Sequence, residues 1–316
     1  QPPSLPQAVR SEMRLLLLGC SGFVGRELVP FLLELGHELT LVSRQSQPFP
    51  ALVGKRLACI RLDPADAASW ADNCLDRALS EAEGVVNLAG EPIAEKRWTL
   101  QHVQLLNSSR IDTTRALVAA VAALPEGQRP GVLINGSAIG YYGTSTSQEF
   151  TETSPAGTDV LGRLCVAWEQ EAHGAEAFCR VVILRIGIVL GGDGGALGKM
   201  LPVFRMGFGG PIGDGQQWMS WISRTDLCQL ISTALADGAY SGVYNAVAPQ
   251  PCNMAAFAAA LGRCLGRPSL LPVPGPLLQL LLGDGAKVVL EGQKVLPKRL
   301  QEQGFAFRYG ELSAAL

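Results

Sequence analysis

One short segment near the start of the chain constrains its fold more than any other. Four consecutive leucines at 15–18 run into a tight loop with glycine at its first, fourth and seventh positions. Apolar residues at helical spacing begin inside the loop and continue beyond it. A strand, a glycine turn and a helix in this order let backbone approach a pyrophosphate and direct the helix N-terminus at the anion. The segment predicts dinucleotide binding rather than an ordinary turn, with contacts from Gly19, Ser21, Gly22, Phe23, Val24 and Gly25.

Apolar runs and amphipathic stretches alternate over the first 190 residues. Alternation of helices with near-continuous apolar strands is typical of a parallel sheet that helices cover on both faces. We therefore expect an α/β fold, a Rossmann-type doubly wound parallel sheet. Its predicted strands are residues 14–18, 39–42, 58–62, 84–88, 132–136 and 181–185, and the helices between them include residues 100–124 and 162–173.

The alternation weakens after about residue 190, where glycine and then proline become frequent. We interpret residues 13–185 as a dinucleotide-binding domain. Residues 186–316 then form a smaller, substrate-side α+β lobe, with one strand near 243–247 that returns to the main sheet. A chain of 316 residues is long enough for this arrangement. Residues 1–12 precede the first methionine and suit a cloning remnant, a species-specific extension or the end of a cleaved transit segment.

Composition and charge favour small-molecule partners. Hydrophobic residues make up 47% of the chain and charged residues 17%, as in a compact globular protein. The net charge of −2 comes without a long run of either sign, which argues against a nucleic-acid surface or a polybasic membrane patch. No apolar stretch reaches the length of a membrane span. The sequence indicates no oligomeric state and leaves a protein partner open.

The cysteines argue for a reducing environment. The eight cysteines form no Cys-x-x-Cys pair and only three histidines are present, so we expect no metal site. Most of the cysteines lie in apolar runs, where buried free thiols are usual. Unpaired thiols predict a reducing compartment, either the cytoplasm or the chloroplast stroma.

The end of the second predicted strand indicates which dinucleotide is bound. An NAD-specific site usually carries an acidic residue about 20 residues after the glycine turn, where it accepts from the ribose 2′-hydroxyl. Here Ser43 and Arg44 occupy that place. A hydroxyl and a guanidinium suit a 2′-phosphate, because both donate charge-assisted hydrogen bonds to it. The pair predicts NADP(H), with a solvated surface arginine as the alternative for Arg44.

Two further strand ends add cofactor candidates. Asp63 follows the third strand, where its carboxylate either accepts from the adenine amino group or caps a helix that begins at Pro64, and the sequence favours neither. Leu88, Ala89 and Gly90 follow the fourth strand, and small residues there let backbone lie against the adenine-side ribose. An ordinary strand-end turn is the competing interpretation.

These residues together resemble the extended short-chain dehydrogenase/reductase superfamily. The likeness continues through Asn135-Gly136-Ser137 and through residues 184–191, 221–227 and 243–246. A narrower likeness covers nearly the whole chain from Met13. Over this range the chain resembles the atypical subfamily of "epimerase family proteins". Its members are nucleoside-diphosphate-sugar epimerase-like, and some are labelled cell-division inhibitors. The segments that carry it are residues 137–143, 209–217 and 290–297.

The resemblance has consequences for the cofactor. It implies NADP(H), with contacts at Ser43, Arg44, Leu88, Arg110 and Val189. Arg110 alone also suits a plain structural role, as a cation on the exposed face of an amphipathic helix. Members of the subfamily occur in bacteria, mitochondria and chloroplasts.

The residues that normally move a proton in this superfamily are missing. Its members use a tyrosine whose pKa is lowered by a lysine four residues later. With Glu169 as the anchor, Leu161 falls at the tyrosine position and Cys165 at the lysine position. No tyrosine and no lysine occurs between Gly143 and Lys199. An alkyl chain and a thiol therefore replace a phenol and an ammonium.

Three nearby hydroxyls are the remaining catalytic candidates. Ser137 keeps the place of the hydroxyl that orients the substrate oxygen, and Tyr141 and Tyr142 follow it in a loop above the strand. The tyrosines supply a phenol in one interpretation and pack or line a pocket in the other. We expect Arg185, at the end of a strand, to support that strand rather than to contact substrate.

The glycine-rich segment of the second lobe offers polar groups for a substrate. Gln216 and Gln217 suit a sugar or a carboxylate, and Trp218 and Trp221 either stack on a ring or belong to the core between the lobes. Two functions follow. The first is an NADP(H)-dependent oxidoreductase or epimerase with an unusual proton relay. The second is a catalytically impaired, NADP(H)-binding regulatory or scaffold protein in cell or plastid division or in photosynthetic assembly.

Overall fold

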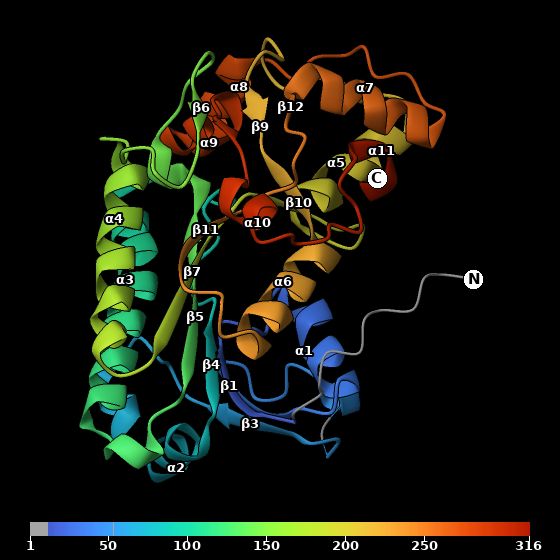
Figure 1. Ribbon diagram of the computed structural model, residues 1–316. Helices are drawn as coiled ribbons and strands as arrows, with labels where there is room; N and C mark the ends of the chain where they lie inside the picture. Colours follow the sequence, from blue (N-terminus) through green and yellow to red (C-terminus); the bar gives the residue numbers. More distant parts are fainter. Residues whose placement is uncertain (1–11, 53) are drawn as a thin grey trace.

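A seven-stranded parallel sheet forms the centre of the molecule. The computed structural model describes residues 12–52 and 54–316, and its main sheet has the order β11-β7-β5-β4-β1-β2-β3 (Figure 1). This sheet confirms the α/β, doubly wound fold. Its strands are β1 (Arg14–Leu18), β2 (Glu38–Ser43), β3 (Leu57–Arg61), β4 (Gly84–Asn87), β5 (Val132–Ala138), β7 (Arg180–Ile186) and β11 (Gly242–Ala246).

Helices cover both faces of the sheet because successive strand residues point to opposite sides. Leu15 and Leu17 of β1 pack in one core cluster with residues of α1 and α6, and Leu16 and Leu18 pack in another with residues of α2 and α3. Figure 1 shows α3 and α4 on one side and α1 and α6 on the other. These helices are α1 (Gly25–Glu34), α2 (Asn73–Glu81), α3 (Leu100–Ala123), α4 (Val160–His173) and α6 (Arg224–Ala236).

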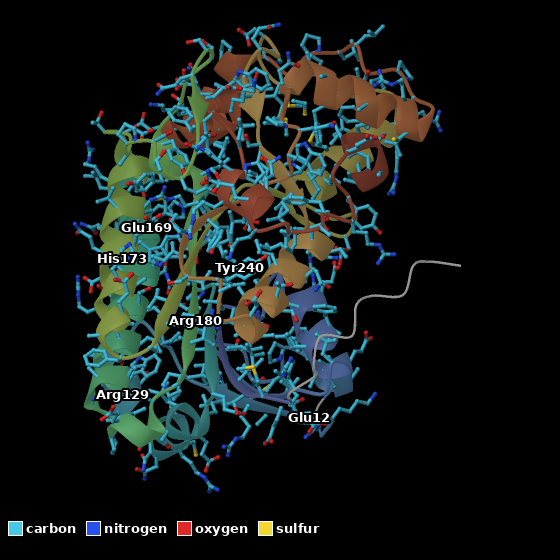
Figure 2. The ribbon with its side chains drawn as sticks, viewed as in Figure 1. Glu12, Arg129, Glu169, His173, Arg180 and Tyr240 are labelled. Carbon is cyan, nitrogen blue, oxygen red and sulfur yellow. The ribbon has the colours of Figure 1, made fainter. Side chains whose placement is uncertain are left out.

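The last strand of the sheet comes from the second half of the chain. β11 pairs in parallel with β7, so that Tyr244 lies beside Leu184. Arg180, at the start of β7, donates hydrogen bonds to the carbonyl oxygens of Ala234 (2.8 Å) in the last turn of α6 and Tyr240 (2.7 Å) in the connection from α6 to β11 (Figure 2). Sequence-distant segments are thereby joined at this edge of the sheet. The division into domains 13–185 and 186–316 stays a prediction.

A smaller cluster of elements lies beyond the carboxyl ends of the strands (Figure 1). Its core contains Leu190, Trp221 and Phe257. Three two-stranded pairings belong to it: β8 (Ile188–Leu190) with β10 (Trp221–Ser223), β9 (Trp218–Met219) with β12 (Cys252–Asn253), and β6 (Glu149–Phe150) with β13 (Lys294–Val295). Its helices are α5 (Gly195–Arg205), α7 (Met254–Leu265), α8 (Gly275–Leu282), α9 (Lys287–Leu290) and α11 (Leu312–Ala315). The short helix α10 (Lys298–Glu302) packs beside β11 instead, with Leu300 in the main core cluster.

Short 3₁₀ helices connect several of these elements. They are η1 (Pro50–Leu52), η2 (Ala67–Ala71), η3 (Glu126–Gln128), η4 (Ile139–Tyr142), η5 (Gly174–Ala177) and η6 (Asp284–Ala286). None of the helices over residues 12–52 and 54–316 is both long and apolar enough to cross a membrane.

Candidate functional site

The glycine turn lies where the order of the strands reverses. From β1 the chain continues outward to β2 and β3, and then returns to β4 on the other side of β1. Ligands of open α/β sheets bind in the crevice at the carboxyl ends of the strands at such a point. Gly19, directly after β1, has φ +70°, and a Cβ atom built on it would lie 2.2 Å from the backbone nitrogen of Ala89 beyond β4. Only glycine permits this close approach of the two strand ends.

The other two glycines of the turn have opposite surroundings. A Cβ atom on Gly25 would lie 1.7 Å from the carbonyl oxygen of Cys20, so any side chain there would collide with backbone. A Cβ atom on Gly22 would meet nothing within 4 Å. Helix α1 begins at Gly25 without a side-chain cap. The turn is therefore closed at its two ends and open at its middle, beside an uncapped helix N-terminus.

The remaining residues of the turn pack against the second half of the chain. The ring of Phe23 lies under the guanidinium of Arg224, whose Cζ is 4.5 Å from the ring centroid. Arg224 Nε also binds Glu27 of α1, with 2.7 Å between Nε and Oε2. Val24 packs against the main core cluster. These contacts hold the turn and the start of α1 in place.

Hydroxyls of the first two strand ends meet beside the turn. Ser43 Oγ donates to Ser21 Oγ at 3.3 Å and accepts from the backbone N–H of Gln45 at 3.1 Å. The Arg44 side chain is 67% exposed, and its Nη2 lies 3.8 Å from Glu91 Oε2. A largely solvated cation thus directly follows one of two hydrogen-bonded serines, and guanidinium and hydroxyl groups are both donors that a phosphate can accept from.

Asp63 does not cap a helix at Pro64, so that alternative is wrong. Its Oδ1 accepts from the backbone N–H of Ala65 at 3.0 Å in a turn, and the next helical segment, η2, begins at Ala67 with Asp66 as its cap. The Asp63 side chain is exposed. Asp66 N–H donates to Asp63 O at 3.1 Å, so residues 63–66 form a turn that ends where the helical segment begins.

The end of β4 runs over a buried arginine. Leu88 N–H donates to Leu18 O at 2.9 Å, and Ala89 N–H donates to Asn87 Oδ1 at 3.2 Å. A Cβ atom on Gly90 would lie 2.7 Å from Cζ of Arg110. Glycine at 90 therefore lets this backbone pass directly across the guanidinium.

Arg110 does not lie on an exposed helix face, as one interpretation of the sequence expected. It is 7% exposed, and its Nη1 and Nη2 donate to the carbonyl oxygens of Leu106 (3.1 Å) and Glu91 (2.8 Å). Its Nε has no hydrogen-bond partner among the described residues. Burial lowers the pKa of Arg110 to about 10, which leaves the group charged at neutral pH. An unpaired N–H on a buried cation is a vacant donor for an anionic or carbonyl oxygen.

A cavity of about 980 Å³ adjoins this arginine. It lies at the carboxyl ends of β5 and β7, where Ala138, Ile186 and Gly187 line it, and α4 contributes Cys165 and Trp168. The opposite wall comes from the smaller cluster of elements and from residues 283–293. Val189 does not line the cavity with its side chain, which packs against the main core cluster.

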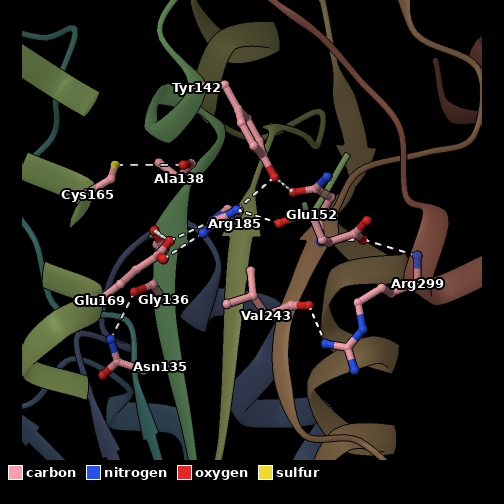
Figure 3. Close-up of polar contacts among 12 residues, drawn as sticks. Asn135, Gly136, Ala138, Tyr142, Glu152, Cys165, Glu169, Arg185, Val243 and Arg299 are labelled. Carbon is pink, nitrogen blue, oxygen red and sulfur yellow. Dashed lines mark hydrogen bonds and ion pairs between the residues drawn. The ribbon is translucent and has the colours of Figure 1, made fainter. Parts of the chain in front are cut away.

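The Ser137 hydroxyl belongs to a buried ion-pair network. Ser137 Oγ donates to Glu169 Oε1 at 2.6 Å, and Glu169 accepts from Arg185 Nε (2.7 Å) and Nη2 (2.8 Å) (Figure 3). The Glu169 and Arg185 side chains are 5% and 4% exposed. As expected, Arg185 supports the strand end. Ser137 itself is 3% exposed and lies one residue before Ala138 of the cavity wall.

The two tyrosines after Ser137 belong to the same network. Tyr142 donates its hydroxyl hydrogen to Asn245 Oδ1 at 2.5 Å and accepts from Arg185 Nη1 at 2.9 Å (Figure 3). Burial raises the pKa of Tyr142 to about 12. The ring of Tyr141 lies against the Arg185 guanidinium, with 3.4 Å between Cζ and the ring centroid. Neither tyrosine lines the cavity, so the structure brings both to Arg185 and not to a substrate.

The positions of the missing tyrosine and lysine do face the cavity. Leu161 and Cys165 of α4 both line it. Cys165 Sγ donates a weak hydrogen bond to Ala138 O at 3.7 Å, and burial raises the pKa of its thiol to about 12. An alkyl group and a neutral thiol therefore stand where a phenol and an ammonium would act.

Only some of the substrate-binding candidates of the second lobe line the cavity. Gln217 is 5% exposed and lines the cavity, as does Trp218, whereas Gln216 is exposed and does not line it. Trp221 is fully buried in the core of the smaller cluster, which removes it as a stacking platform. The sequence reasoning missed an ion group on the wall, Lys287 with Asp159 and Glu291, because its members meet only through the tertiary fold.

Family comparisons match most of the sequence. The NAD dependent epimerase/dehydratase family matches residues 15–246. A second match, to a domain of unknown function (DUF1731), covers residues 273–316. The two together include the glycine turn, the main sheet and the C-terminal wall of the cavity.

Individual relatives cover nearly the whole chain. "Epimerase family protein SDR39U1 homolog, chloroplastic" of Arabidopsis thaliana is 44% identical over 310 residues, which are 97% of this chain and 86% of that protein. The human protein "Epimerase family protein SDR39U1" is 38% identical over 308 residues, covering 96% of this chain and 98% of that protein. YfhF, an epimerase family protein of Bacillus subtilis, is 35% identical over 306 residues, with coverages of 96% and 97%.

Solved structures agree with these relationships. A crystal structure of human SDR39U1 (isoform 2) with NADPH superimposes with a TM-score of 0.84 at 36% identity, covering 96% of this chain and 97% of that one. A UDP-glucuronic acid 4-epimerase of Bacillus cereus, in complex with UDP-glucuronic acid and NAD, gives a TM-score of 0.75 at 19% identity, with 96% of each chain covered. That second likeness shows the fold alone.

Proposed function

Since the chain belongs to the NAD dependent epimerase/dehydratase family, we propose that it binds NADP(H) across the carboxyl edge of its main sheet. The pyrophosphate lies over the turn of Gly19, Ser21, Gly22, Phe23, Val24 and Gly25, at the N-terminus of α1. Ser43 and Arg44 hold the 2′-phosphate. Asp63, Leu88, Ala89, Gly90, Arg110 and Val189 supply the other contacts, Val189 through its backbone.

The strongest support for this binding mode is the contrast between the crowded Gly19 and Gly25 and the open Gly22. A Cβ atom on Gly19 or Gly25 would collide with backbone, whereas a Cβ atom on Gly22 would meet no described residue beyond its chain neighbours within 4 Å. The open middle of the turn leaves room for a ligand at the uncapped N-terminus of α1. The unpaired Nε of Arg110 gives the same indication, because a buried donor is expected to have a partner. The known structure of human SDR39U1 with NADPH supports the choice of cofactor.

The reaction that fits this site is an oxidoreductase or epimerase reaction on a substrate in the cavity. NADP(H) would supply hydride transfer there. In this proposal Ser137 is the catalytic candidate closest to the cavity, held by Glu169, and Tyr141 and Tyr142 position Arg185. The Ser137 hydroxyl donates to Glu169, so its oxygen keeps its accepting capacity for a substrate hydroxyl.

A second function is favoured by one specific observation. The wall positions that correspond to the proton-transferring pair carry Leu161 and Cys165, and neither is a proton donor near neutral pH. A chain that keeps a cofactor site and lacks this pair suits an NADP(H)-binding regulatory or scaffold protein in cell or plastid division or photosynthetic assembly. In either case we propose a reducing compartment, cytoplasm or chloroplast stroma, because all eight cysteines are free.

A cofactor titration tests the binding proposal. We expect NADPH to bind more tightly than NADH, and Arg44→Asp to weaken NADPH binding by about 10- to 150-fold, the range for hydrogen bonds to a charged group. Arg77→Asp is the matched control, because Arg77 is an exposed arginine that pairs with Glu81 on the surface of α2. Equal affinities for the two cofactors, or an unaffected Arg44→Asp protein, would show that Arg44 faces only solvent.

A labelling experiment separates the two functions. With NADPH deuterated at C4, an oxidoreductase transfers label to a compound in a metabolite panel. A regulatory protein transfers none, and instead changes its affinity for a protein partner when NADPH is added. A partner whose binding is indifferent to NADPH and to Arg44→Asp would contradict the regulatory alternative.

A further inference from the structure

The wall of the large cavity is apolar on the side that faces away from the main sheet. Its aliphatic and thioether side chains come from five separate elements. They are Ile188 of β8, Met200 of α5, Met219 of β9, Met254 of α7 and Leu290 of α9. Because these side chains converge from distant parts of the chain, the cavity is built by tertiary packing and is not the gap beside one loop. A wall of this kind binds by removing apolar surface from water.

Three tryptophans add flat apolar surface to the wall. Each has its one polar group, the indole N–H, engaged within the chain. Trp98 donates to Ile93 O (2.9 Å), Trp168 to Thr114 Oγ1 (3.1 Å) and Trp218 to Thr146 O (3.0 Å). The indoles therefore offer ring surface and no free hydrogen-bond donor to a ligand.

Three charged side chains on the wall, Lys287, Asp159 and Glu291, are paired with one another. Lys287 Nζ lies 3.6 Å from Asp159 Oδ2 and 3.7 Å from Glu291 Oε2, and Glu291 also accepts from Thr144 Oγ1 at 2.7 Å. A diphosphate needs unpaired cations, whereas this group carries two carboxylates for one ammonium. It would repel a diphosphate at the distances at which it would have to bind.

Besides Arg110 on the cofactor side, two arginines line the wall, and each donates a hydrogen bond to a backbone carbonyl. Arg97 Nη1 donates to Leu280 O at 2.8 Å, and Arg163 Nη1 donates to Thr158 O. Both side chains are exposed at the rim. Each keeps further N–H donors at this exposed rim, so a direct comparison of UDP-glucose with an apolar probe has to decide between the two ligand classes.

Gln293, on the wall, has its amide hydrogens committed to the chain. Its Nε2 donates to Ile139 O (3.2 Å) and Gly143 O (2.8 Å), which fixes residues 139–143 against the C-terminal segment. A sugar ring needs several unpaired partners for its hydroxyls, and this amide offers no hydrogen to them.

Apart from Arg110 Nε, one buried polar atom among the described wall residues has no partner. Gln217 is 5% exposed, and its Nε2 donates to Ile212 O (2.8 Å) and Val289 O (3.0 Å). Two carbonyl acceptors fix which end of the amide is NH₂, so the other end is the acceptor Oε1. That oxygen has no hydrogen-bond donor within the described part of the chain. A single buried acceptor in an apolar wall suits a ligand with one hydroxyl group.

The entrance to the cavity has the same character as its wall. Gln279 and Gly283, in and after α8, belong to the lining, and Leu277 (47% exposed), Leu280 (70%) and Leu281 (59%) of the same helix face outward beside them. This part of the rim therefore combines exposed hydrocarbon with the Arg97 guanidinium, which donates to Leu280 O.

We propose that the cavity binds an apolar, ring-bearing alcohol, or the ketone to which it is oxidised, and not a nucleoside-diphosphate sugar. The ring packs among the methionines and tryptophans, and the hydroxyl hydrogen is donated to Gln217 Oε1. As the substrate of an NADP(H) reaction this ligand class rests on the proposed function. Its binding, however, depends only on the cavity wall.

The experiment is a calorimetric titration of the full chain with three probes, each with and without saturating NADPH. We expect 2-naphthol to bind, 2-methoxynaphthalene to bind about tenfold more weakly because it lacks the donor, and UDP-glucose not to bind. Val289→Asn, which places an amide on the wall, lowers the affinity for 2-naphthol about fivefold, and the exposed Val203→Asn leaves it unchanged. Gln217→Leu removes the difference between the two naphthalenes.

Each failure has its own meaning. Tighter binding of UDP-glucose than of 2-naphthol overturns the ligand class, and so does an unchanged affinity in Val289→Asn. Equal binding of the two naphthalenes by the unaltered protein overturns the role of Gln217 without reference to any variant. If NADPH fails to bind while 2-naphthol binds as expected, the proposed cofactor function falls and the apolar cavity stands.

Discussion

The buried pair of Glu169 and Arg185 gives the most demanding test of how this structure is stabilised. Two charge-assisted hydrogen bonds of 2.7 and 2.8 Å join them, and the side chains are 5% and 4% exposed. Glu169→Gln keeps the shape of the side chain but removes the charge that compensates Arg185. The guanidinium then stays buried with only neutral partners, among them the hydroxyl of Tyr142.

The cost follows from that uncompensated charge. Removing one partner of a buried ion pair costs about 3–5 kcal/mol of the free energy of unfolding, because the remaining ion keeps its desolvation penalty. The same helix supplies a matched control. Glu171 pairs with Arg115 at 2.7 Å, but these side chains are 27% and 60% exposed, so Glu171→Gln should cost less than about 1 kcal/mol.

Equilibrium unfolding in guanidinium chloride, monitored by tryptophan fluorescence, measures both values. The midpoint of Glu169→Gln should lie far below that of the unaltered protein, and the midpoint of Glu171→Gln close to it. Restoring a carboxylate by Glu169→Asp should recover part of the loss. If the two glutamine variants were equally stable, the pair would not carry a buried charge and the reasoning about Arg185 would be refuted.

Three further predictions test other parts of the molecule. Gly25→Ala should lower the free energy of unfolding by about 1–3 kcal/mol because its Cβ meets the backbone. Gly22→Ala should leave the stability unchanged but weaken NADPH binding. Thermal unfolding with and without NADPH measures both effects. At pH 8 iodoacetamide should label the exposed Cys264 in the native protein but Cys165 only after denaturation, since burial raises the pKa of the Cys165 thiol to about 12. Mass spectra that show labelled Cys165 in the native protein would contradict this. Burial also raises the pKa of Tyr142 to about 12. The protonated hydroxyl therefore adds about 2–3 kcal/mol to the free energy of unfolding below pH 10, and this contribution is lost by pH 12. The unfolding midpoint of Tyr142→Phe should fall less over that range than the midpoint of the unaltered protein, and an equal fall would refute the assignment.

The sequence predicted those features that depend on short-range pattern. The strand of leucines, the glycine turn and the helix after it are contiguous, and their spacing reflects steric needs that the structure shows at Gly19 and Gly25. The expectation that Arg185 supports a strand end was also correct. A cation next to a buried strand needs a counter-charge, and Glu169 was already the anchor of the superfamily pattern.

Features that depend on long-range contacts were beyond the sequence. Nothing near Tyr142 indicates that its hydroxyl binds Asn245, which comes from β11 at the edge of the sheet. Arg110 lies in a helix whose pattern suits an exposed cation, yet the backbone at Gly90 passes over its guanidinium and buries it. The apolar wall of the cavity likewise forms only when separate elements meet, so no single segment shows it.

The same long-range contacts explain what became of the catalytic hydroxyls. The superfamily's tyrosine position holds Leu161 here, and the candidate hydroxyls that remain have other partners: Ser137 donates to Glu169 and Tyr142 donates to Asn245. Each hydroxyl has one hydrogen, and each hydrogen is committed to a buried acceptor. Because Arg185 contacts both Glu169 and Tyr142, releasing either hydrogen would disturb a buried cation. The network therefore stabilises the fold and leaves neither hydroxyl hydrogen free for proton transfer in the cavity.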